Sequence, residues 1–341
     1  MNIQSYFQVE HKNTFDTTKN FGKFGEIWAL ASIGNSKIIT GSIDGTLRLY
    51  SINISTKQCE PKSYIENSHG IRTAINCITI CDNKFFISCG DDGSIKTWSI
   101  SGDHITEDSQ IRYHNKNVKK IILLNNKELL ASCSLDKTIK IWEKKSPHNL
   151  VKDATLQEWN KVYSIIQLKV IRNPDDPQNI LVDSWGTNCG FVTMWDLNTF
   201  KRIGTMKNIY TCCPNGLIEL SNGMVAVSQY DPLEIVIFDP YAYIVVQHIK
   251  NDVIKGQNSL LELPGGFFVY INDGNYIQIK INDNYDIVKA YNETKKEIVN
   301  GQERKVKVLK DLKGSAGLIL MENNKYILTN NDSNGIGIFS F

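Results

Sequence analysis

A stretch of thirty residues, 114–143, constrains the fold of this chain more than any other part of it. Three short runs of apolar and β-branched residues lie within it, at about 118–124, 129–134 and 138–142, and short turns separate them. Alternation with a period of two residues and tight turns between the runs indicate an antiparallel meander. A meander this small cannot bury its own faces, so it predicts further copies in the chain.

Two such copies precede it. The segments 41–50 (GSIDGTLRLY) and 90–98 (GDDGSIKTW) repeat the pattern of 134–142 (SLDKTIKIW). In each copy an Asp stands four residues after a hydroxyl residue and six before an aromatic one: Thr40, Asp44 and Tyr50; Ser88, Asp92 and Trp98; Ser132, Asp136 and Trp142. Two copies also have an upstream histidine, His69 or His114, and a literal Trp-Asp pair occurs at 195–196. This spacing predicts a repeat protein.

With these residues the chain resembles the WD-repeat β-propellers, whose repeats span about 40–45 residues and form blades of four strands. In that family the Asp of the tight turn accepts a hydrogen bond from the histidine, which is also linked to the hydroxyl and to the Trp indole. The resemblance implies two such tetrads: His69, Ser88, Asp92 and Trp98; His114, Ser132, Asp136 and Trp142. A buried network of this kind stabilises a fold when every member is satisfied, so we interpret both tetrads as structural.

The resemblance predicts an all-β chain that forms one domain over residues 1–341, a seven-bladed propeller of four-stranded antiparallel blades. Its repeats are strongest over 25–145 and degenerate toward the C-terminus. The predicted blades lie at about 25–58, 69–108, 114–152, 158–205, 210–250, 256–292 and 314–341. In the first blade Lys23 occupies the usual histidine position, and in the fourth Cys189 stands where the Asp is expected.

The two ends of the chain predict how the ring closes. Residues 3–10 read as a strand with no partner nearby, whereas the last segment, 326–341, stops where the third strand of a repeat ends. We therefore expect the N-terminal strand to complete the last blade, a closure that leaves no open sheet edge.

An insertion at 293–313 separates the last two predicted blades. Asn300-Gly301 lies between two strand-like runs and predicts a type I′ hairpin. Seven Lys or Arg against three acidic residues make the segment 295–313 basic. Two interpretations stay open: an outer strand pair with a solvated face, or a basic arm that uses Arg304 and Lys305 to bind a partner.

Composition excludes several classes of protein. With 41% hydrophobic and 22% charged residues the chain is typical of a globular protein with a large core, and a net charge of +2 predicts no general attraction to nucleic acid or membranes. No signal peptide and no apolar run of the ~18 residues that a transmembrane helix needs is found, so we expect no membrane insertion. Eight cysteines occur, several of them in strands (Cys77, Cys89 and Cys133) as is typical of buried free thiols. The prediction is a cytoplasmic protein, with the nucleus as the alternative.

No catalytic or cofactor motif is present in the sequence. It lacks a phosphate-binding Gly-x-x-x-x-Gly-Lys loop, a GxGxxG turn, a GxSxG elbow and an HExxH motif. Cys77 and Cys81, like the adjacent Cys212 and Cys213, have no second Cys/His pair at zinc spacing. We therefore predict no cofactor, no metal site and no enzymatic activity; an active site in the central channel is the weakest alternative.

These observations favour a monomeric propeller that serves as a scaffold or adaptor for protein or peptide partners. The resemblance places the usual contact surface where the inner strands begin, and the aligned positions here are Glu26, Trp28, Thr73, Ile75, Asn117, Lys119, Lys161 and Tyr163. Trp28 could equally pack against the last blade. Two alternatives remain: a ribonucleoprotein-associated propeller that uses the basic 295–313 arm, and, since abundant Ile, Asn and Lys are typical of AT-rich genomes, a secreted effector of an intracellular bacterium that engages host proteins.

Overall fold

The computed structural model describes the following residues: 10–16, 26–53, 58–124, 129–146, 149–157, 162–171, 179–186, 189–196, 199–207, 214–229, 234–250, 260–263, 267–272, 275–281, 287–291, 296–299, 302–305, 318–321, 326–330 and 335–340. Every regular element in these ranges is a β-strand, and the ranges contain no helix. The prediction of an all-β chain built from four-stranded antiparallel sheets is confirmed.

The three N-terminal sheets each contain four consecutive strands in chain order. Their strands are β2 (Ile27–Ile33), β3 (Lys37–Ser42), β4 (Leu47–Asn53) and β5 (Gln58–Ile65); β6 (Ile75–Ile80), β7 (Phe85–Gly90), β8 (Ile95–Ser101) and β9 (His104–Ile111); β10 (Val118–Leu123), β11 (Leu129–Ser134), β12 (Thr138–Ser146) and β13 (Asn149–Gln157). The fourth strands end later than the predicted blade limits at 58, 108 and 152 because outer strands are mostly polar and lack an apolar alternation.

The next three sheets repeat this order. Their strands are β14 (Val162–Ile171), β15 (Asn179–Gly186), β16 (Cys189–Asp196) and β17 (Lys201–Lys207); β18 (Pro214–Glu219), β19 (Val225–Gln229), β20 (Glu234–Asp239) and β21 (Ile244–Lys250); β22 (Leu260–Leu263), β23 (Phe267–Asn272), β24 (Asn275–Ile281) and β25 (Ile287–Tyr291). A further sheet has the order β1 (Glu10–Asp16), β30 (Gly335–Ser340), β29 (Tyr326–Asn330) and β28 (Leu318–Met321). The described residues thus contain seven four-stranded sheets.

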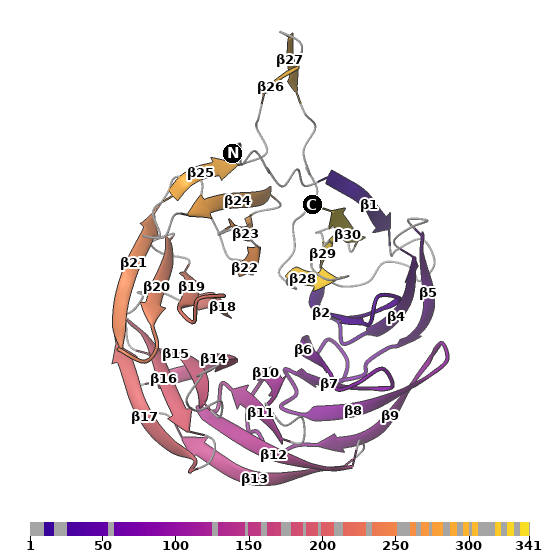
Figure 1. Cartoon of the computed structure of the whole chain (residues 1–341). Coiled ribbons are helices and arrows are strands. Elements are labelled where there is room, and N and C mark those ends of the chain that lie inside the picture. The colour runs from indigo at the N-terminus through magenta and orange to yellow at the C-terminus, as the bar shows by residue number, and fades with distance from the viewer. Residues whose placement is uncertain are drawn as a thin grey trace.

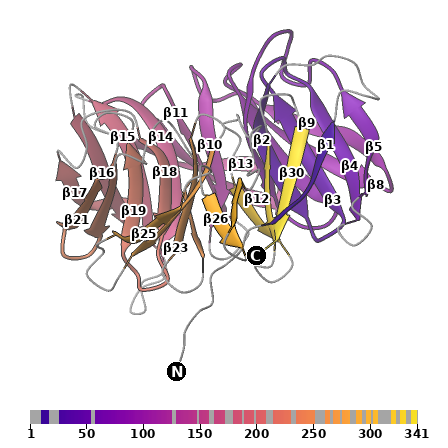
Figure 2. The ribbon, with the colours of Figure 1, turned by 90° about the horizontal axis from the view of Figure 1, so that it is seen from above.

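The sheets are arranged around a circle, with the first strand of each consecutive sheet toward the centre and the fourth on the outside (Figure 1). Turned by 90°, the strands run between the two flat sides of a disc (Figure 2). Inner strands contact one another from sheet to sheet: β2 with β6, β6 with β10, β10 with β14, β14 with β18 and β18 with β22. Strand β2 also contacts β28 and β29, which come from the other end of the chain.

The N-terminal strand joins the C-terminal sheet. Strand β1 pairs antiparallel with β30, from Glu10 opposite Ser340 to Asp16 opposite Gly335. The strand begins at the end of the segment predicted for this pairing, 3–10, and residues 1–9 lie outside the described part of the chain. Six of the seven residues of β1 (EHKNTFD) are polar, so apolar periodicity in the sequence does not reveal this strand.

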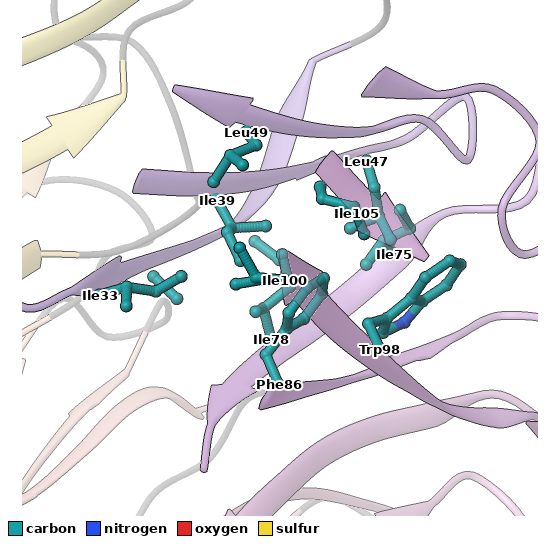
Figure 3. Packing of buried hydrophobic residues seen from close by; sticks show 12 residues of the cluster. Ile33, Ile39, Leu47, Leu49, Ile75, Ile78, Phe86, Trp98, Ile100 and Ile105 are labelled. Carbon is teal, nitrogen blue, oxygen red and sulfur yellow. The ribbon is translucent and has the colours of Figure 1, made fainter. Parts of the chain in front are cut away.

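The core lies between neighbouring sheets (Figure 3). One cluster joins the β2–β5 sheet to the β6–β9 sheet and includes Ile39, Leu47, Ile75, Phe86 and Trp98. The second strands β3, β7 and β11 are buried at every position but the first, because sheets cover both of their faces. Burial on both faces favours an unbroken run of apolar and small residues without polar alternation, as in the sequences KIITGS, FFISCG and LLASCS. Each large apolar side chain buried here contributes about 1.5–3 kcal/mol.

Strands β26 (Lys296–Val299) and β27 (Gln302–Lys305) form a two-stranded antiparallel hairpin. The hairpin projects away from the ring (Figure 1). Val299 is opposite Gln302, which agrees with the two-residue connection predicted at Asn300-Gly301; the turn itself lies outside the described residues.

Candidate functional site

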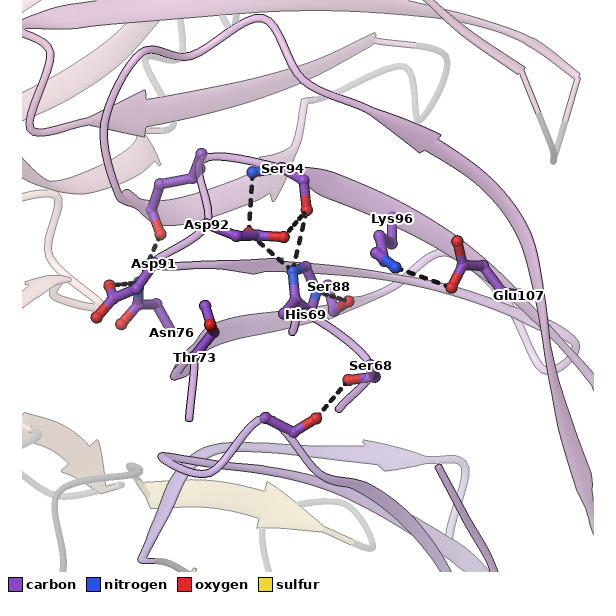
Figure 4. Close-up of polar contacts among 12 residues, drawn as sticks. Ser68, His69, Thr73, Asn76, Ser88, Asp91, Asp92, Ser94, Lys96 and Glu107 are labelled. Atoms are coloured by element: carbon purple, nitrogen blue, oxygen red, sulfur yellow. Dashed lines mark hydrogen bonds and ion pairs between the residues drawn. The ribbon is translucent and has the colours of Figure 1, made fainter. Parts of the chain in front are cut away.

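The first predicted tetrad is assembled between the β5–β6 loop and strands β7 and β8 (Figure 4). The ring of His69 lies with Nε2 2.6 Å from Ser88 Oγ and Nδ1 3.1 Å from Asp92 Oδ1. Trp98 Nε1 donates to the same Ser88 Oγ at 2.8 Å. His69, Ser88 and Trp98 are buried, and Ser94, two residues after the Asp, adds a further hydroxyl 3.1 Å from His69 Nδ1.

The second tetrad repeats this geometry one sheet later. His114 Nε2 lies 2.8 Å from Ser132 Oγ, and its Nδ1 lies 2.8 Å from Asp136 Oδ2. Trp142 Nε1 donates to Ser132 Oγ at 2.8 Å. Thr138 donates to Asp136 Oδ1 at 2.6 Å, in the place that Ser94 takes in the first tetrad. Sequence reasoning missed Ser94 and Thr138, although a hydroxyl residue stands two positions after the turn Asp in all three repeats.

A neutral imidazole with its proton on Nδ1 satisfies every contact of His114. Trp142 donates to the Ser132 oxygen, the Ser132 hydroxyl donates to Nε2, and Nδ1–H donates to the Asp136 carboxylate. Burial lowers the pKa of His114, and this effect is larger than the opposing effect of the hydrogen bond to Asp136. Burial alone would raise the pKa of Asp136, but the hydrogen bonds from His114 and Thr138 outweigh it and hold that pKa well below its usual range. At neutral pH the network therefore consists of a neutral histidine and an ionised aspartate.

The first repeat keeps the turn but replaces the rest of the network. Asp44 Oδ1 accepts from Thr46 N at 3.0 Å, as Asp92 does from Ser94 N and Asp136 from Thr138 N. The guanidinium of Arg48 is fully buried and donates to Ser42 Oγ at 3.1 Å, while burial lowers its pKa despite nearby Tyr50 and Asp44. Lys23, at the histidine position, lies outside the described residues.

The tight turns support the loops of the neighbouring sheet. A Cβ on Gly45 (φ +84°) would lie 2.6 Å from Gly70 O, and one on Gly93 (φ +77°) would lie 3.0 Å from His114 O. Ser68 Oγ also donates to Gly45 O at 2.8 Å (Figure 4). The turns 42–46 and 90–94 each pack against the loop that leads into the next sheet, and the turn 134–138 bonds to the loop 112–117 through Ser134 Oγ and Leu135 N. We call the surface formed by these three turns and the loops 66–73 and 112–117 the turn face.

Gly90 lies directly under the first tetrad. A Cβ there would lie 2.7 Å from Ala74 O and 3.0 Å from His69 Nδ1, and neither the backbone nor the buried ring can move aside cheaply. We expect Gly90→Ala to lower the free energy of unfolding by about 3 kcal/mol, measured by urea denaturation. Gly102→Ala, where the space is open and only the φ of +58° opposes a side chain, should cost about 1 kcal/mol. An equal effect of the two substitutions would contradict the packing described for His69.

The residues predicted to bind a partner have different surroundings in the structure. Glu26 is exposed, and its carboxylate accepts a hydrogen bond from Nε1 of the partly buried Trp28 at 3.3 Å. Thr73 and Asn117 are half-buried on the turn face. The prediction for Ile75 is wrong: it is fully buried in the core between the first two sheets, because the inner strand already turns that position inward.

Lys119 is held in a polar cluster between two sheets. Its Nζ lies 3.1 Å from Asp91 Oδ1 and 3.4 Å from Asn76 Oδ1, and Asn76 Nδ2 donates to the same Asp91 oxygen at 2.7 Å. The cluster links β6 to β10 across the sheet boundary, so Lys119 supports the joint between sheets.

For the four remaining predicted partner-binding residues the structure describes at most the backbone. Lys161 lies outside the described residues, and Tyr163, Arg304 and Lys305 are described as strand residues of β14 and β27.

Exposed apolar residues on the turn face were missed by the sequence alignment. Ile71 is 78% exposed and Tyr113 is 57% exposed, and Ile43 lies at the tip of the first turn. Each stands within two residues of a turn Asp or a tetrad histidine, a position that the repeats themselves identify. The ring of Tyr113 also lies 5.8 Å from that of Trp142, so the exposed residue rests on the second tetrad.

Cys77, Cys89 and Cys133 are buried free thiols, as predicted. No group of three or more His, Cys, Asp or Glu residues in the described ranges is placed to hold a metal ion. None of the described segments forms a helix with the length and apolar character needed to span a bilayer.

Three segments of the chain, residues 16–51, 62–99 and 107–143, match the family model of the WD domain, G-beta repeat. The chain contains WD40 repeats. The matched segments cover the three N-terminal repeats that carry the regular spacing of hydroxyl, Asp and aromatic residues. The degenerate C-terminal sheets follow the same strand order with few of these residues.

Parts of the chain are also similar in sequence to parts of three known proteins. Over 75 residues the chain is 33% identical to the ubiquitin homeostasis protein lub1 of Schizosaccharomyces pombe, a match covering 22% of this chain and 10% of lub1. It is 32% identical over 91 residues to the nuclear distribution protein PAC1 of Candida albicans, covering 26% of this chain and 19% of PAC1. The match to PAC1 of Candida dubliniensis has 31% identity over 116 residues, 33% of this chain and 23% of that protein. The chain thus spans less than a quarter of the length of these relatives.

The fold as a whole is similar to that of a solved WD40 propeller. The WD40 β-propeller domain of Doa1 superimposes with a TM-score of 0.68, covering 98% of each chain at 19% sequence identity. The likeness therefore extends past the three matched repeats to the C-terminal sheets, where the sequence signal is weak.

Proposed function

We propose that this WD40-repeat chain is a non-catalytic platform that binds a protein or peptide partner on the turn face. The observation that carries the proposal is the exposure of Ile71 (78%) and Tyr113 (57%) on loops that are fastened from below by hydrogen bonds and packing. Large apolar side chains presented together on a rigid surface are typical of interaction sites.

Rigidity of these loops favours binding because little conformational entropy is lost when a partner docks. The 66–73 loop is held by the hydrogen bonds from Ser68 N and Ser68 Oγ to Gly45 O, both 2.8 Å long. The 112–117 loop is held through His114 and by Asn115 N, which donates to Asp136 Oδ2 at 3.1 Å. In this proposal the tetrads do no chemistry; they position the residues that meet the partner.

We also infer a closed seven-bladed ring in which β1 supplies the outer strand of the last blade. The pairing of β1 with β30 and the contacts of β2 with β28 and β29 support this closure, since they join the two ends of the chain. A closed ring gives the last blade its fourth strand and holds the turn face in one geometry.

WD40 propellers typically bind protein partners, which supports the general proposal. The relatives named above serve different processes, ubiquitin homeostasis and nuclear distribution, so no common partner follows from them.

Affinity capture from the native cell lysate tests the proposal. We expect wild-type protein to retain a discrete partner and a variant carrying Ile71→Lys and Tyr113→Ala to lose it, since each hot-spot residue contributes at least ~2 kcal/mol, or about thirtyfold in affinity. Tyr64→Lys, a substitution of an exposed residue on the outer strand β5, serves as the control and should retain the partner. Equal recovery of the partner by the turn-face variant and by wild type, with both proteins folded, would contradict the assignment of the turn face as the binding surface.

The projecting β26–β27 hairpin supports a second candidate, a nucleic-acid role for the basic 295–313 segment. Its strands pair Lys296 with Lys305 and Glu297 with Arg304, and the hairpin projects away from the ring (Figure 1). The two candidates differ in salt dependence: binding of RNA through phosphate contacts weakens steeply as salt is added, whereas docking on an apolar surface does not.

A further inference from the structure

The outer strand of the β18–β21 sheet presents an unusual edge. Strand β21 pairs with β20 on one side, and no described strand pairs with its other side. The N–H of His248 donates instead to the neighbouring side-chain oxygen of Gln247 at 3.2 Å. A row of main-chain donors and acceptors at a sheet edge is a template for a further strand.

The side chains along this edge are apolar and exposed. Ile244 is 55% exposed and Val246 is 42% exposed, with Val245 between them and Tyr241 and Tyr243 just before them. The ring of Tyr243 lies over Gly204 of β17, where an added Cβ would come within 2.2 Å of it. That contact makes the surface continuous with Ile203 of β17, which is 50% exposed. Two neighbouring outer strands therefore share one apolar surface.

Other outer strands carry the features that protect a sheet edge, namely charged residues and proline. Strand β5 has Glu60, Pro61 and Lys62 in its middle, β9 has Glu107 and Asp108, and β13 has Lys152 and Asp153. Strand β21 reads IVVQHIK, with its one lysine at the last position. Among these four strands, β21 alone has neither a proline nor a Lys, Arg, Asp or Glu at an interior position.

The charges that flank the apolar surface and face outward are cationic. Lys250 has a side chain that is 66% exposed, whereas its partner Glu234, 3.4 Å away, is 4% exposed. Lys201 and Arg202 on β17 are exposed. The carboxylate of the half-buried Asp239 accepts hydrogen bonds from Tyr241 N and Ala242 N at 2.8 and 2.9 Å, so part of its charge is already compensated. A ligand with acidic groups on either side of an apolar centre complements this arrangement.

The charges at the two ends of the apolar residues favour a peptide with acidic flanks. Lys250 on β21, and Lys201 and Arg202 on β17, can each attract a carboxylate of such a peptide. A peptide that adds as a strand needs only such an edge, because main-chain hydrogen bonds supply affinity and alternate side chains supply specificity.

We propose that β21, with Ile203 and Tyr243 beside it, binds an extended peptide of alternating apolar residues flanked by acidic residues, which adds to the sheet as a fifth strand. This site lies on the outer rim and is independent of the turn face. It is a second interaction surface that a tethered or transient partner can use while the turn face is occupied.

Fluorescence anisotropy with a designed peptide tests the proposal. The probe is a fluorescein-labelled peptide of about ten residues, long enough to follow β21 at ~3.3 Å per residue, with alternating valine and threonine between pairs of glutamates. We expect saturable binding to wild type that falls by at least about tenfold in the variant Ile244→Lys/Val246→Lys. Ile71→Lys, on the turn face, should bind the probe as wild type does. Circular dichroism and thermal unfolding establish that all variants are folded.

Two further probes separate the parts of the proposal. A peptide N-methylated at alternate residues, which removes main-chain donors, should not bind, and a lysine-flanked peptide should bind about tenfold more weakly than the glutamate-flanked one. Undiminished binding of either peptide overturns the proposal, as does undiminished binding of the original probe to the double variant. Self-association in sedimentation that the double variant abolishes, without peptide binding, would assign the edge to a second copy and also overturn it.

Discussion

Replacing Trp142 with alanine is expected to lower the free energy of unfolding by about 3–5 kcal/mol. The side chain is fully buried, and it packs in the cluster between the second and third sheets with Val118, Ile121 and Leu130. Alanine would leave a cavity there and would also remove the indole donor to Ser132 Oγ, whose bond is 2.8 Å long. Chemical denaturation followed by circular dichroism measures the change, and the slope with denaturant should stay constant if the folded state is otherwise intact.

Conservative variants divide this loss into packing and hydrogen bonding. Trp142→Phe keeps most of the volume and removes the donor, so it should cost about 1–2 kcal/mol. Tyr64→Ala provides a comparison for an aromatic residue that is 46% exposed and should cost under about 1 kcal/mol. A Trp142→Ala loss as small as that of Tyr64→Ala would contradict the buried position of Trp142.

Acidification is expected to destabilise the protein in two steps that arise from the two tetrads. The folded pKa of His114 is lowered by burial, so as pH falls below about 6.5 the unfolded chain binds a proton that the folded chain does not, and stability is lost. The folded pKa of Asp136 is also lowered, as is that of Asp92, by hydrogen bonds that outweigh burial. Their contribution is present above the unfolded pKa of about 3.9 and is lost as pH falls below it toward the folded pKa.

The variant Asp136→Asn tests the second step. It should lower the free energy of unfolding at pH 7 by about 3 kcal/mol, because the buried His114 loses its charged acceptor. Below about pH 4 the variant should lose less stability on further acidification than wild type, since one of the two tetrad carboxylates with a lowered pKa is gone. Urea denaturation at a series of pH values measures both effects. Parallel pH profiles for the variant and wild type would show that Asp136 does not supply the dependence.

The N-terminal half of the fold could be predicted from sequence because its signals are local. Ser132, Asp136 and Trp142 lie within eleven residues of one another, and their spacing follows from one tight turn between two paired strands. The same spacing in 88–98 places Ser88, Asp92 and Trp98 alike. Spacing of this kind can be recognised in a sequence because each residue must contact partners on the adjacent strand.

Prediction failed where a residue's environment depends on another sheet. Ile75 aligned with Trp28 and Lys119, which are partly buried, yet the neighbouring sheet covers Ile75 completely. Lys119 lies in a joint with Asn76 and Asp91, residues of the preceding sheet that are remote in sequence. The strand that pairs with β30 is more polar than the segment predicted for it, since an outer strand is held by main-chain hydrogen bonds and needs no apolar alternation.

The sequence by itself determined the kind of repeat, the composition of each tetrad and the all-β class, because these depend on contacts between adjacent strands of one chain segment. Only the tertiary structure decided which of the repeated positions are exposed. Ile71 and Ile75 are four residues apart and equally apolar, but one is 78% exposed and the other is fully buried. Burial depends on the surfaces that surround a side chain in space, and in a ring of sheets those surfaces come from the neighbouring sheet.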